Sequence, residues 1–243
     1  MLHLVRLFAA LLVTLAVLSP AAALELTDRN LDVAGAIDIK AAATLSDKLL
    51  KLDADSAEPI FLLITATQGS AQGVMIVADT IRSLKSPVVA VVLTHVRDAG
   101  AALAVLTDRV DMFPSAGLLF GEIEYEGVKK PEPPAEPKPG ETAPKAKDPT
   151  PAEQTLQKVR QAFLDRFHGR LAKRLGMKPE ALTAAIKGGG LVMTADEAVA
   201  QKVASSVVDQ LTYAQVPSVK TEVKVITTRK DTKIVKPAVE GSK

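Results

Sequence analysis

The sequence contains no cysteine, no tryptophan and only three histidines among its 243 residues. Without cysteine, a disulfide framework, a thiolate metal site and an N-terminal lipid anchor on cysteine are all excluded. The formal net charge is only +2, so the composition gives no reason to expect a nucleic-acid partner. No metal-ligand spacing or cofactor motif occurs either, and we expect neither a metal ion nor a cofactor.

Aromatic residues are also scarce. They make up 3% of the chain, whereas hydrophobic residues as a whole reach 47%, mostly alanine, valine and leucine. Such a core is packed from small aliphatic side chains between helices and sheet. A chain of this length corresponds to one globular domain with appendages.

The N-terminus has the pattern of a secretory signal peptide. Arg6 precedes an apolar run from Leu7 to Leu18, and Ala21–Ala23 supplies small residues for cleavage. We predict that residues 1–23 are removed after Ala23 and that the mature protein is periplasmic or secreted. The alternative is an uncleaved membrane anchor, but the run is shorter than the ~20 residues of a spanning helix.

Hydrophobic periodicity in residues 24–124 predicts an α/β fold. Apolar runs on both faces, as in "PIFLLIT" and "PVVAVVLTH", are typical of buried parallel strands. Alternation of strands with helices at this spacing favours a parallel sheet with helices on its faces. We expect strands at 31–34, 59–65, 87–95 and 109–114, and helices at 39–52, 75–84 and 99–106, with "GSAQG" as a tight turn. The helix at 39–52 should bury Ile39, Ala43, Leu45, Leu49, Leu50 and Leu52.

The second half of the chain begins with a change of composition. Residues 125–153 carry eight prolines among lysine, glutamate and alanine, and we predict an extended, solvated loop. Pro151 then opens a long helix, with two shorter helices in "KPEALTAAIKGGG" and "TADEAVAQKVA". We expect an apolar stripe on the long helix, made of Leu156, Val159, Phe163, Phe167, Leu171 and Leu175. Residues 154–213 should complete the domain, and residues 214–243 form a basic tail with one edge strand.

Ligands of open parallel sheets bind beyond the carboxyl ends of the strands. Those ends are "TATQGSAQG", "THVRDAG" and the segment after Pro114. Gly69 would let backbone N–H groups face the cleft, as an oxyanion hole requires. In "THVRDAG", Asp98 stands where an apolar strand turns into an apolar helix.

The same segments resemble the Clp protease proteolytic subunit family. "LLITATQGSAQGVMIVADTI" is similar to the family's strand, Asn-Ser-Pro-Gly-Gly-Ser turn and helix, and the family's later aspartate falls on Asp79. "VVAVVLTHVRDAGAAL" resembles the strand and small-residue turn that present the nucleophile, and "TADEAVAQKVASSVV" the C-terminal signature, with Lys202 and Ser205 as departures. The long helix is similar to that of the related signal peptide peptidases. The resemblance spans Leu31 to Val208 and implies a Clp/crotonase-like parallel sheet with flanking helices and a protruding helical handle through which subunits associate.

The resemblance places no catalytic triad member on a suitable residue. The nucleophilic serine falls on Asp98, the histidine on Gly121 and the third member on Gly190. A carboxylate cannot replace the hydroxyl, because it would repel the developing oxyanion. The binding cleft would be formed by Gln68, Gly69, Ser70 and Ala99, with Gln68 and Thr67 in place of a family glycine and proline.

We therefore favour a catalytically degenerate homologue that binds peptide or protein and forms a homo-oligomer. An active, ATP-independent endopeptidase with rearranged residues is an alternative, using Ser70, Ser115 or a lysine such as Lys129 or Lys130. A crotonase-like acyl-coenzyme A enzyme is a second alternative. Of the remaining polar residues, we expect His95 to cap its strand, Arg97 to pair with Asp98 or face solvent, and His168 to lie at a surface or interface. Asp108, Arg109 and Asp111 are predicted to be charges at the rim of a strand.

Overall fold

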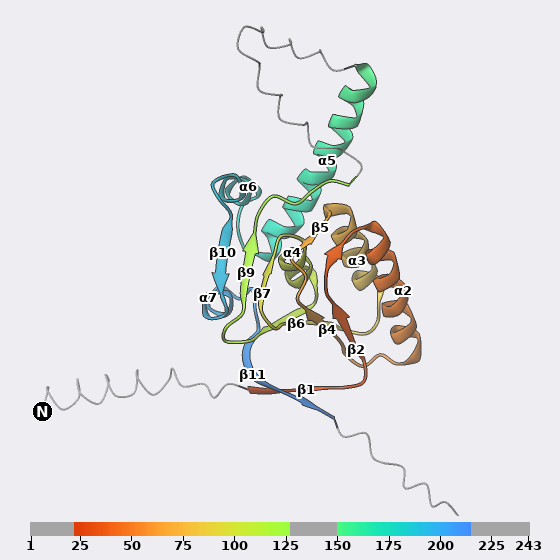
Figure 1. The fold of residues 1–243 in the computed structure, drawn as a ribbon, viewed down its shortest axis with the longest axis vertical. Coiled ribbons are helices and arrows are strands. Elements are labelled where there is room, and N and C mark those ends of the chain that lie inside the picture. Colours follow the sequence, from red (N-terminus) through yellow and green to blue (C-terminus); the bar gives the residue numbers. More distant parts are fainter. Residues whose placement is uncertain (1–21, 127–149, 215–243) are drawn as a thin grey trace, which may run out of the picture.

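The computed structural model describes residues 22–126 and 150–214. Six parallel strands form its main sheet, in the order β1-β11-β8-β6-β4-β2 (Figure 1). The α/β class and the parallel sheet predicted from the sequence are confirmed. The strands are β1 (Ala22–Leu26), β2 (Asn30–Val33), β4 (Ile60–Ile64), β6 (Val88–Val92), β8 (Arg109–Met112) and β11 (Ser206–Tyr213).

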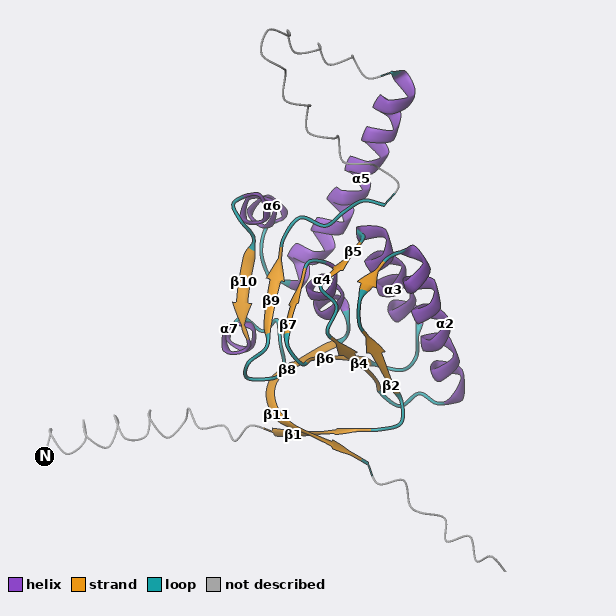
Figure 2. Ribbon diagram, in the orientation of Figure 1, coloured by secondary structure: helices purple, strands orange, loops and turns teal. Residues whose placement is uncertain are grey.

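The centre of the sheet is buried on both faces, which explains the continuous apolar runs of β4 and β6. Three helices cover one face, namely α2 (Ile39–Asp55), α3 (Ala71–Ser83) and α4 (Ala99–Leu106). On the other face, Leu24 and Leu26 of β1 and Val208 of β11 pack against β4 and β6. Figure 2 shows β1 and β11 running together beneath the other strands, so the sheet curls over a second, smaller core.

Two small sheets lie beyond the main one. The first pairs β3 (Ala36–Ile37) with β5 (Gln68–Gly69), and the second has the order β10-β9-β7. Its strands are β7 (His95–Arg97), β9 (Gly117–Phe120) and β10 (Leu191–Thr194). The predicted strand at 87–95 was therefore too long, because the chain leaves the main sheet after Val92 and enters another with His95.

The C-terminal half contributes α5 (Pro151–Arg174), α6 (Pro179–Lys187) and α7 (Ala195–Ala200). Helix α5 extends away from the rest of the fold as a handle (Figure 1). Its C-terminal end is fixed by Arg170, which pairs with Asp79 of α3 at 2.7 Å, and by Arg174, which donates to the Val105 carbonyl of α4 at 2.7 Å. Both halves of the chain share one core, because Phe167 and Leu171 pack in it with the sheet and α4.

The predicted apolar faces were only partly correct. On α5, Phe167, Leu171 and Leu175 are buried, but Leu156 and Val159 are about half exposed because that half of the helix projects from the domain. On α2, Leu45 and Leu49 are buried as predicted, whereas Ile39, Ala43 and Leu50 are exposed and Ala42 and Ser46 take their place. The buried face of α2 is therefore rotated from the predicted one.

Two boundaries also differ from the prediction. "GSAQG" is not a free turn, because Ser70 caps α3 and the helix begins at Ala71. The long helix opens at Pro151 as predicted, so residues 151–153, which the predicted loop at 125–153 also included, form the first turn of α5, where Thr150 and Glu153 make a capping box. The proposed signal peptide up to residue 21, the proline-rich segment at 127–149 and the tail from 215 lie outside the described residues. Within the described residues no helix has the length and hydropathy needed to span a membrane.

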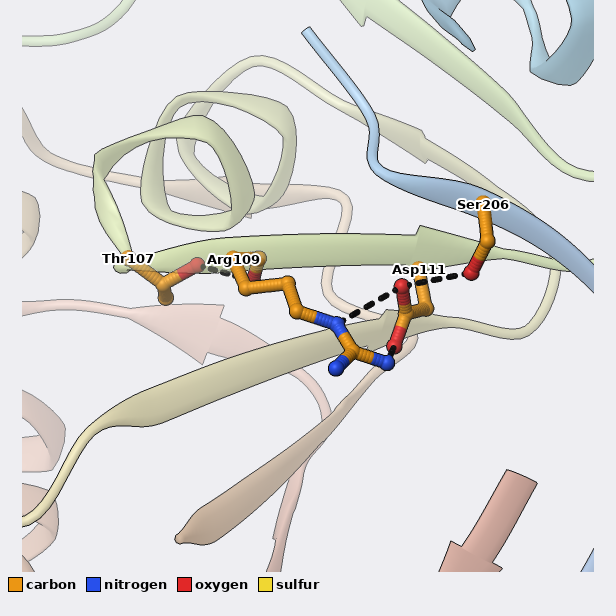
Figure 3. Close-up of polar contacts among 4 residues, drawn as sticks. All are labelled: Thr107, Arg109, Asp111 and Ser206. Atoms are coloured by element: carbon orange, nitrogen blue, oxygen red, sulfur yellow. Dashed lines mark hydrogen bonds and ion pairs between the residues drawn. The ribbon is translucent and has the colours of Figure 1, made fainter.

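Asp111 was predicted to be a charge at the rim of a strand, but this prediction is wrong, because its side chain is fully buried. Its carboxylate accepts hydrogen bonds from the Arg109 guanidinium at 2.5 and 3.1 Å and from the Ser206 hydroxyl at 2.8 Å (Figure 3). Ser206 lies opposite Asp111 in the parallel pairing of β11 with β8. These contacts tie the C-terminal strand to the sheet. Asp108 does lie at the rim, where it accepts from the Val88 N–H at 2.8 Å.

Candidate functional site

A cleft of about 630 Å³ lies between β5, the β7–α4 junction and the segment that follows β9. We call this segment, residues 121–126, the strap. Carboxylates dominate the lining, and among the described residues that line the cleft Arg97 is the only basic one. The lining residues are Ala36, Asp38, Gln68, Gly69, Ser70, Arg97, Asp98, Glu122, Glu124 and Glu126.

Asp98 occupies a sharp turn between β7 and α4. Its backbone has φ 49° and ψ −109°, a conformation that a residue with a side chain rarely adopts. Such a conformation costs on the order of 1–3 kcal/mol and persists only where the surrounding contacts impose it. The Asp98 N–H donates to the Leu119 carbonyl at 2.8 Å, which fixes the turn against β9. A strained strand-to-helix turn of this kind is how α/β hydrolases expose a nucleophile.

Both oxygens of the Asp98 carboxylate have a donor. Oδ1 accepts from the Gly121 N–H at 3.0 Å, and Oδ2 lies 3.1 Å from the Arg97 guanidinium. The expected pairing of Arg97 with Asp98 is therefore present. His95 begins β7, is exposed and is not among the residues that line the cleft. The structure thus does not pair His95 with Asp98.

The three positions indicated by the resemblance lie close together. The Gly121 N–H donates a hydrogen bond to the Asp98 carboxylate. A Cβ atom built on Gly190 would lie 3.1 Å from the carbonyl oxygen of Phe120, the residue before Gly121. The chain therefore brings the three positions to one place. There it presents one carboxylate and two glycines, with no hydroxyl or imidazole.

The turn at β5 keeps a shape that requires glycine. Gly69 has φ 146°, and a Cβ there would lie 2.6 Å from the Ile37 carbonyl oxygen and 2.8 Å from Ala99 Cβ. Ala99 is buried as the first residue of α4, whose leading N–H groups have no partner within the helix. Of the four residues proposed for a binding cleft, Gln68, Gly69 and Ser70 line this cavity, whereas Ala99 packs against Gly69 and is not part of its lining.

The candidate serines have other surroundings. Ser70 is buried, and its Oγ accepts from the Gly73 N–H at 3.0 Å and donates to Glu126 Oε2 at 3.2 Å. Sequence analysis missed this capping role, although serine before a helix is a recognised signal. Ser115 lies exposed in the turn between β8 and β9 and does not line the cleft. Lys129 and Lys130 lie outside the described residues.

His168 lies on the handle beside a smaller cavity of about 220 Å³, between α5, α6 and the strap. Its pKa is lowered by burial in the first place and by the charge of Lys187, while Asp165 acts in the opposite direction. Sequence analysis placed it at a surface or interface, and the ring is in fact half-buried. The acidic residues of the strap were missed altogether, because no local pattern shows that this segment returns to the cleft.

No group of three or more histidine, aspartate or glutamate side chains in the described ranges is arranged to hold a metal ion. The carboxylates of the cleft are therefore spread along its walls and do not converge on one point. The cleft is therefore a negatively charged groove, with the backbone at Gln68, Gly69 and Ser70 along one side.

Comparison with known proteins identifies chains with a similar fold. A family model described as Clp protease matches residues 20–119, which include Asp98 but neither Gly121 nor Gly190. Among solved structures, a point mutant of ClpP1 from Listeria monocytogenes matches with a TM-score of 0.56 and 17% sequence identity, over 75% of this chain and 92% of that one. A search of curated protein sequences found no match.

The chain has a Clp protease-like fold. This confirms the fold expected from the motif resemblance. The Clp protease-like sheet with its handle is therefore established as the fold, whatever chemistry the site performs.

Proposed function

We propose that this chain is an exported, catalytically degenerate Clp-like serine peptidase homologue that binds peptide or protein without cutting it. One observation carries the proposal. The strained strand-to-helix turn is kept, but it presents Asp98, and the neighbouring positions 121 and 190 are glycines without side chains.

The chemistry of the site supports the absence of hydrolysis. Acyl transfer requires a nucleophile that is activated by an adjacent base, and a site that does not repel the oxyanion as it develops. The Asp98 carboxylate is engaged by the Gly121 N–H and the Arg97 guanidinium, and none of the described lining residues is a histidine. Removal of a triad serine or histidine lowers turnover by about 10⁶-fold in a serine protease.

The cleft supports retention of a peptide. It has the volume of a ligand site, and the backbone of β5 lies along one wall. Five carboxylates line the cleft, those of Asp38, Asp98, Glu122, Glu124 and Glu126, and among the described lining residues Arg97 is the only basic one. Complementary charge therefore favours a basic, extended segment.

Two measurements test this function. A fluorophosphonate probe should not label the protein, and labelled casein should not be cleaved above background. A fluorescein-labelled decapeptide of alternating lysine and valine should bind in an anisotropy titration, and its glutamate–valine counterpart should bind at least tenfold more weakly. Labelling at Ser70 or Ser115 would instead favour the active peptidase, although Ser70 is a buried helix cap and Ser115 lies outside the cleft.

The acyl-coenzyme A alternative receives no support from the lining. A cleft rich in carboxylates repels the phosphates of coenzyme A. Calorimetry with coenzyme A should therefore show no heat of binding to the full chain.

Export and self-association belong to the same proposal. Cleavage after Ala23 would leave Leu24 as the first residue, and N-terminal sequencing of the protein recovered from the periplasm tests this. Association is supported by the projecting half of α5, where Leu156 and Val159 are 49% and 55% exposed. Light scattering at micromolar concentration should give an oligomer, and L156S/V159S should lower the mass without unfolding the domain. A monomeric mass for the unaltered protein would contradict this part.

A further inference from the structure

The strap meets the chain directly after β5. β5 itself pairs with β3, and Ser70, the residue that follows β5, forms an isolated parallel β-bridge with Glu124 of the strap. The Ser70 N–H accordingly points to β3, where it donates to the Ile37 carbonyl at 3.0 Å, and the Ala71 N–H donates to the Glu124 carbonyl at 2.9 Å. An open strand edge is where an extended peptide adds as a further strand. Here a residue of the chain itself fills that place.

Polar contacts hold both ends of the strap. At its start, the Gly121 N–H donates to Asp98 Oδ1. At its end, the Gln72 side-chain amide donates to the Glu126 carbonyl and accepts from the Glu126 N–H, each at 3.0 Å. The Glu126 carboxylate also accepts from the N–H of Ile39, the first residue of α2, at 3.1 Å. An acidic group is stabilised at the N-terminus of a helix.

The strap also contacts the handle. The ring of Tyr125 packs edge-on against Phe163 of α5, with ring centroids 5.5 Å apart. Most of the other contacts are single hydrogen bonds at exposed positions, which contribute little net free energy each. The strap is therefore held well enough to pair with the chain at Ser70 but weakly enough for this pairing to open.

We propose that the strap is an autoinhibitory segment: Glu124 pairs with the chain at Ser70, directly after β5, in place of a peptide, and this pairing must open, with the strap carboxylates remaining at the cleft, before an extended peptide can pair there. This inference rests on the proposed peptide-binding function. The apparent dissociation constant of a peptide is then its intrinsic value divided by the fraction of molecules in which this pairing is open.

The first test loosens the strap. Gln72 does not line the cleft, so Q72A removes both bonds to the Glu126 backbone without altering the lining. Loss of two net hydrogen bonds should increase the open fraction, and the lysine–valine decapeptide should bind about tenfold more tightly. Gln201→Ala, at an exposed glutamine after α7, is the matched control and should leave the affinity unchanged.

The second test locks the strap. The chain has no cysteine, so S70C/E124C introduces a single possible disulfide. Strands paired in a sheet lie about 4.8 Å apart, which is within the range that a disulfide bridges. The oxidised double variant should bind the decapeptide at least tenfold more weakly than the same protein after reduction.

The outcomes separate this inference from the function on which it rests. If the decapeptide binds but neither Q72A nor oxidation of S70C/E124C changes its affinity, the strap does not control the cleft and the inference is overturned, while the proposed function stands. If no form binds the decapeptide, including Q72A and the reduced double variant, the peptide-binding function fails and this inference fails with it.

Discussion

The Asp98 carboxylate packs so closely against the backbone of Gly121 that a side chain at position 121 would collide with it. Asp98 Oδ1 lies 3.0 Å from the Gly121 nitrogen, and a Cβ atom on Gly121 would lie 2.6 Å from the same oxygen. The carboxylate thus fills the space that a side chain at position 121 would need. Aspartate at position 98 and glycine at position 121 are therefore coupled through packing.

This coupling predicts a double-mutant result. Gly121 does not have a positive φ, so G121A should be penalised only by the contact with Asp98, at about 1–3 kcal/mol of unfolding free energy. D98A removes that contact, and G121A should then be nearly neutral in urea unfolding. G69A serves as the control, because its Cβ would meet the Ile37 carbonyl oxygen at 2.6 Å and D98A cannot relieve it. Equal costs of G121A in both backgrounds would refute the coupling.

Restoring a hydroxyl should not restore catalysis. D98S places serine on the strained turn, but positions 121 and 190 still supply neither a base nor a carboxylate. A serine without an adjacent base is a weak nucleophile at neutral pH. We expect casein turnover by D98S to stay at the background of the unaltered protein. An increase of tenfold or more would reveal a base elsewhere in the cleft.

The sequence predicted those parts of the fold that depend on local pattern. β4 and β6 are buried on both faces, so their apolar runs identified them. α4 was placed correctly at 99–106, since an alanine-rich segment follows the turn at Asp98. β1 and β11 were missed, because polar and apolar residues are mixed in them and the two strands pair with each other across almost the whole length of the chain.

The same distinction applies to the site. Asp98, Gly121 and Gly190 were found by motif order, and the structure brings them together. The strap was not foreseen, because its pairing with Ser70 and Gln72 depends on how the chain returns after β9. Local pattern also misjudged Asp111, since an aspartate in "RVDM" has no sequence signal for the Ser206 hydroxyl that meets it from β11.

The cluster at Asp111 predicts an asymmetric response to mutation. Arg109 is about half exposed, whereas Asp111 is fully buried. R109M leaves a buried carboxylate with only the Ser206 hydroxyl, whereas D111N leaves an arginine that water can solvate. We expect R109M to lower the free energy of unfolding by about 2–4 kcal/mol and D111N by about half as much, measured by urea denaturation. A larger loss for D111N would mean that the carboxylate's hydrogen bonds outweigh its burial.

His168 should make stability depend on pH in the mildly acidic range. Burial lowers its pKa below the ordinary value of 6.5, so the folded protein binds this proton less readily than the unfolded chain does. The associated stability is present above pH 6.5 and is lost as the pH falls from 6.5 towards the lowered folded pKa. Asp165 and Lys187 oppose each other around the ring, and Glu122 and Arg160 line the same cavity. Urea unfolding at pH 7.5 and 5.5 should show lower stability at 5.5, where carboxylates with lowered pKa such as Glu197 remain ionised. H168Q should reduce that difference, and an unchanged difference would assign the pH dependence to another group.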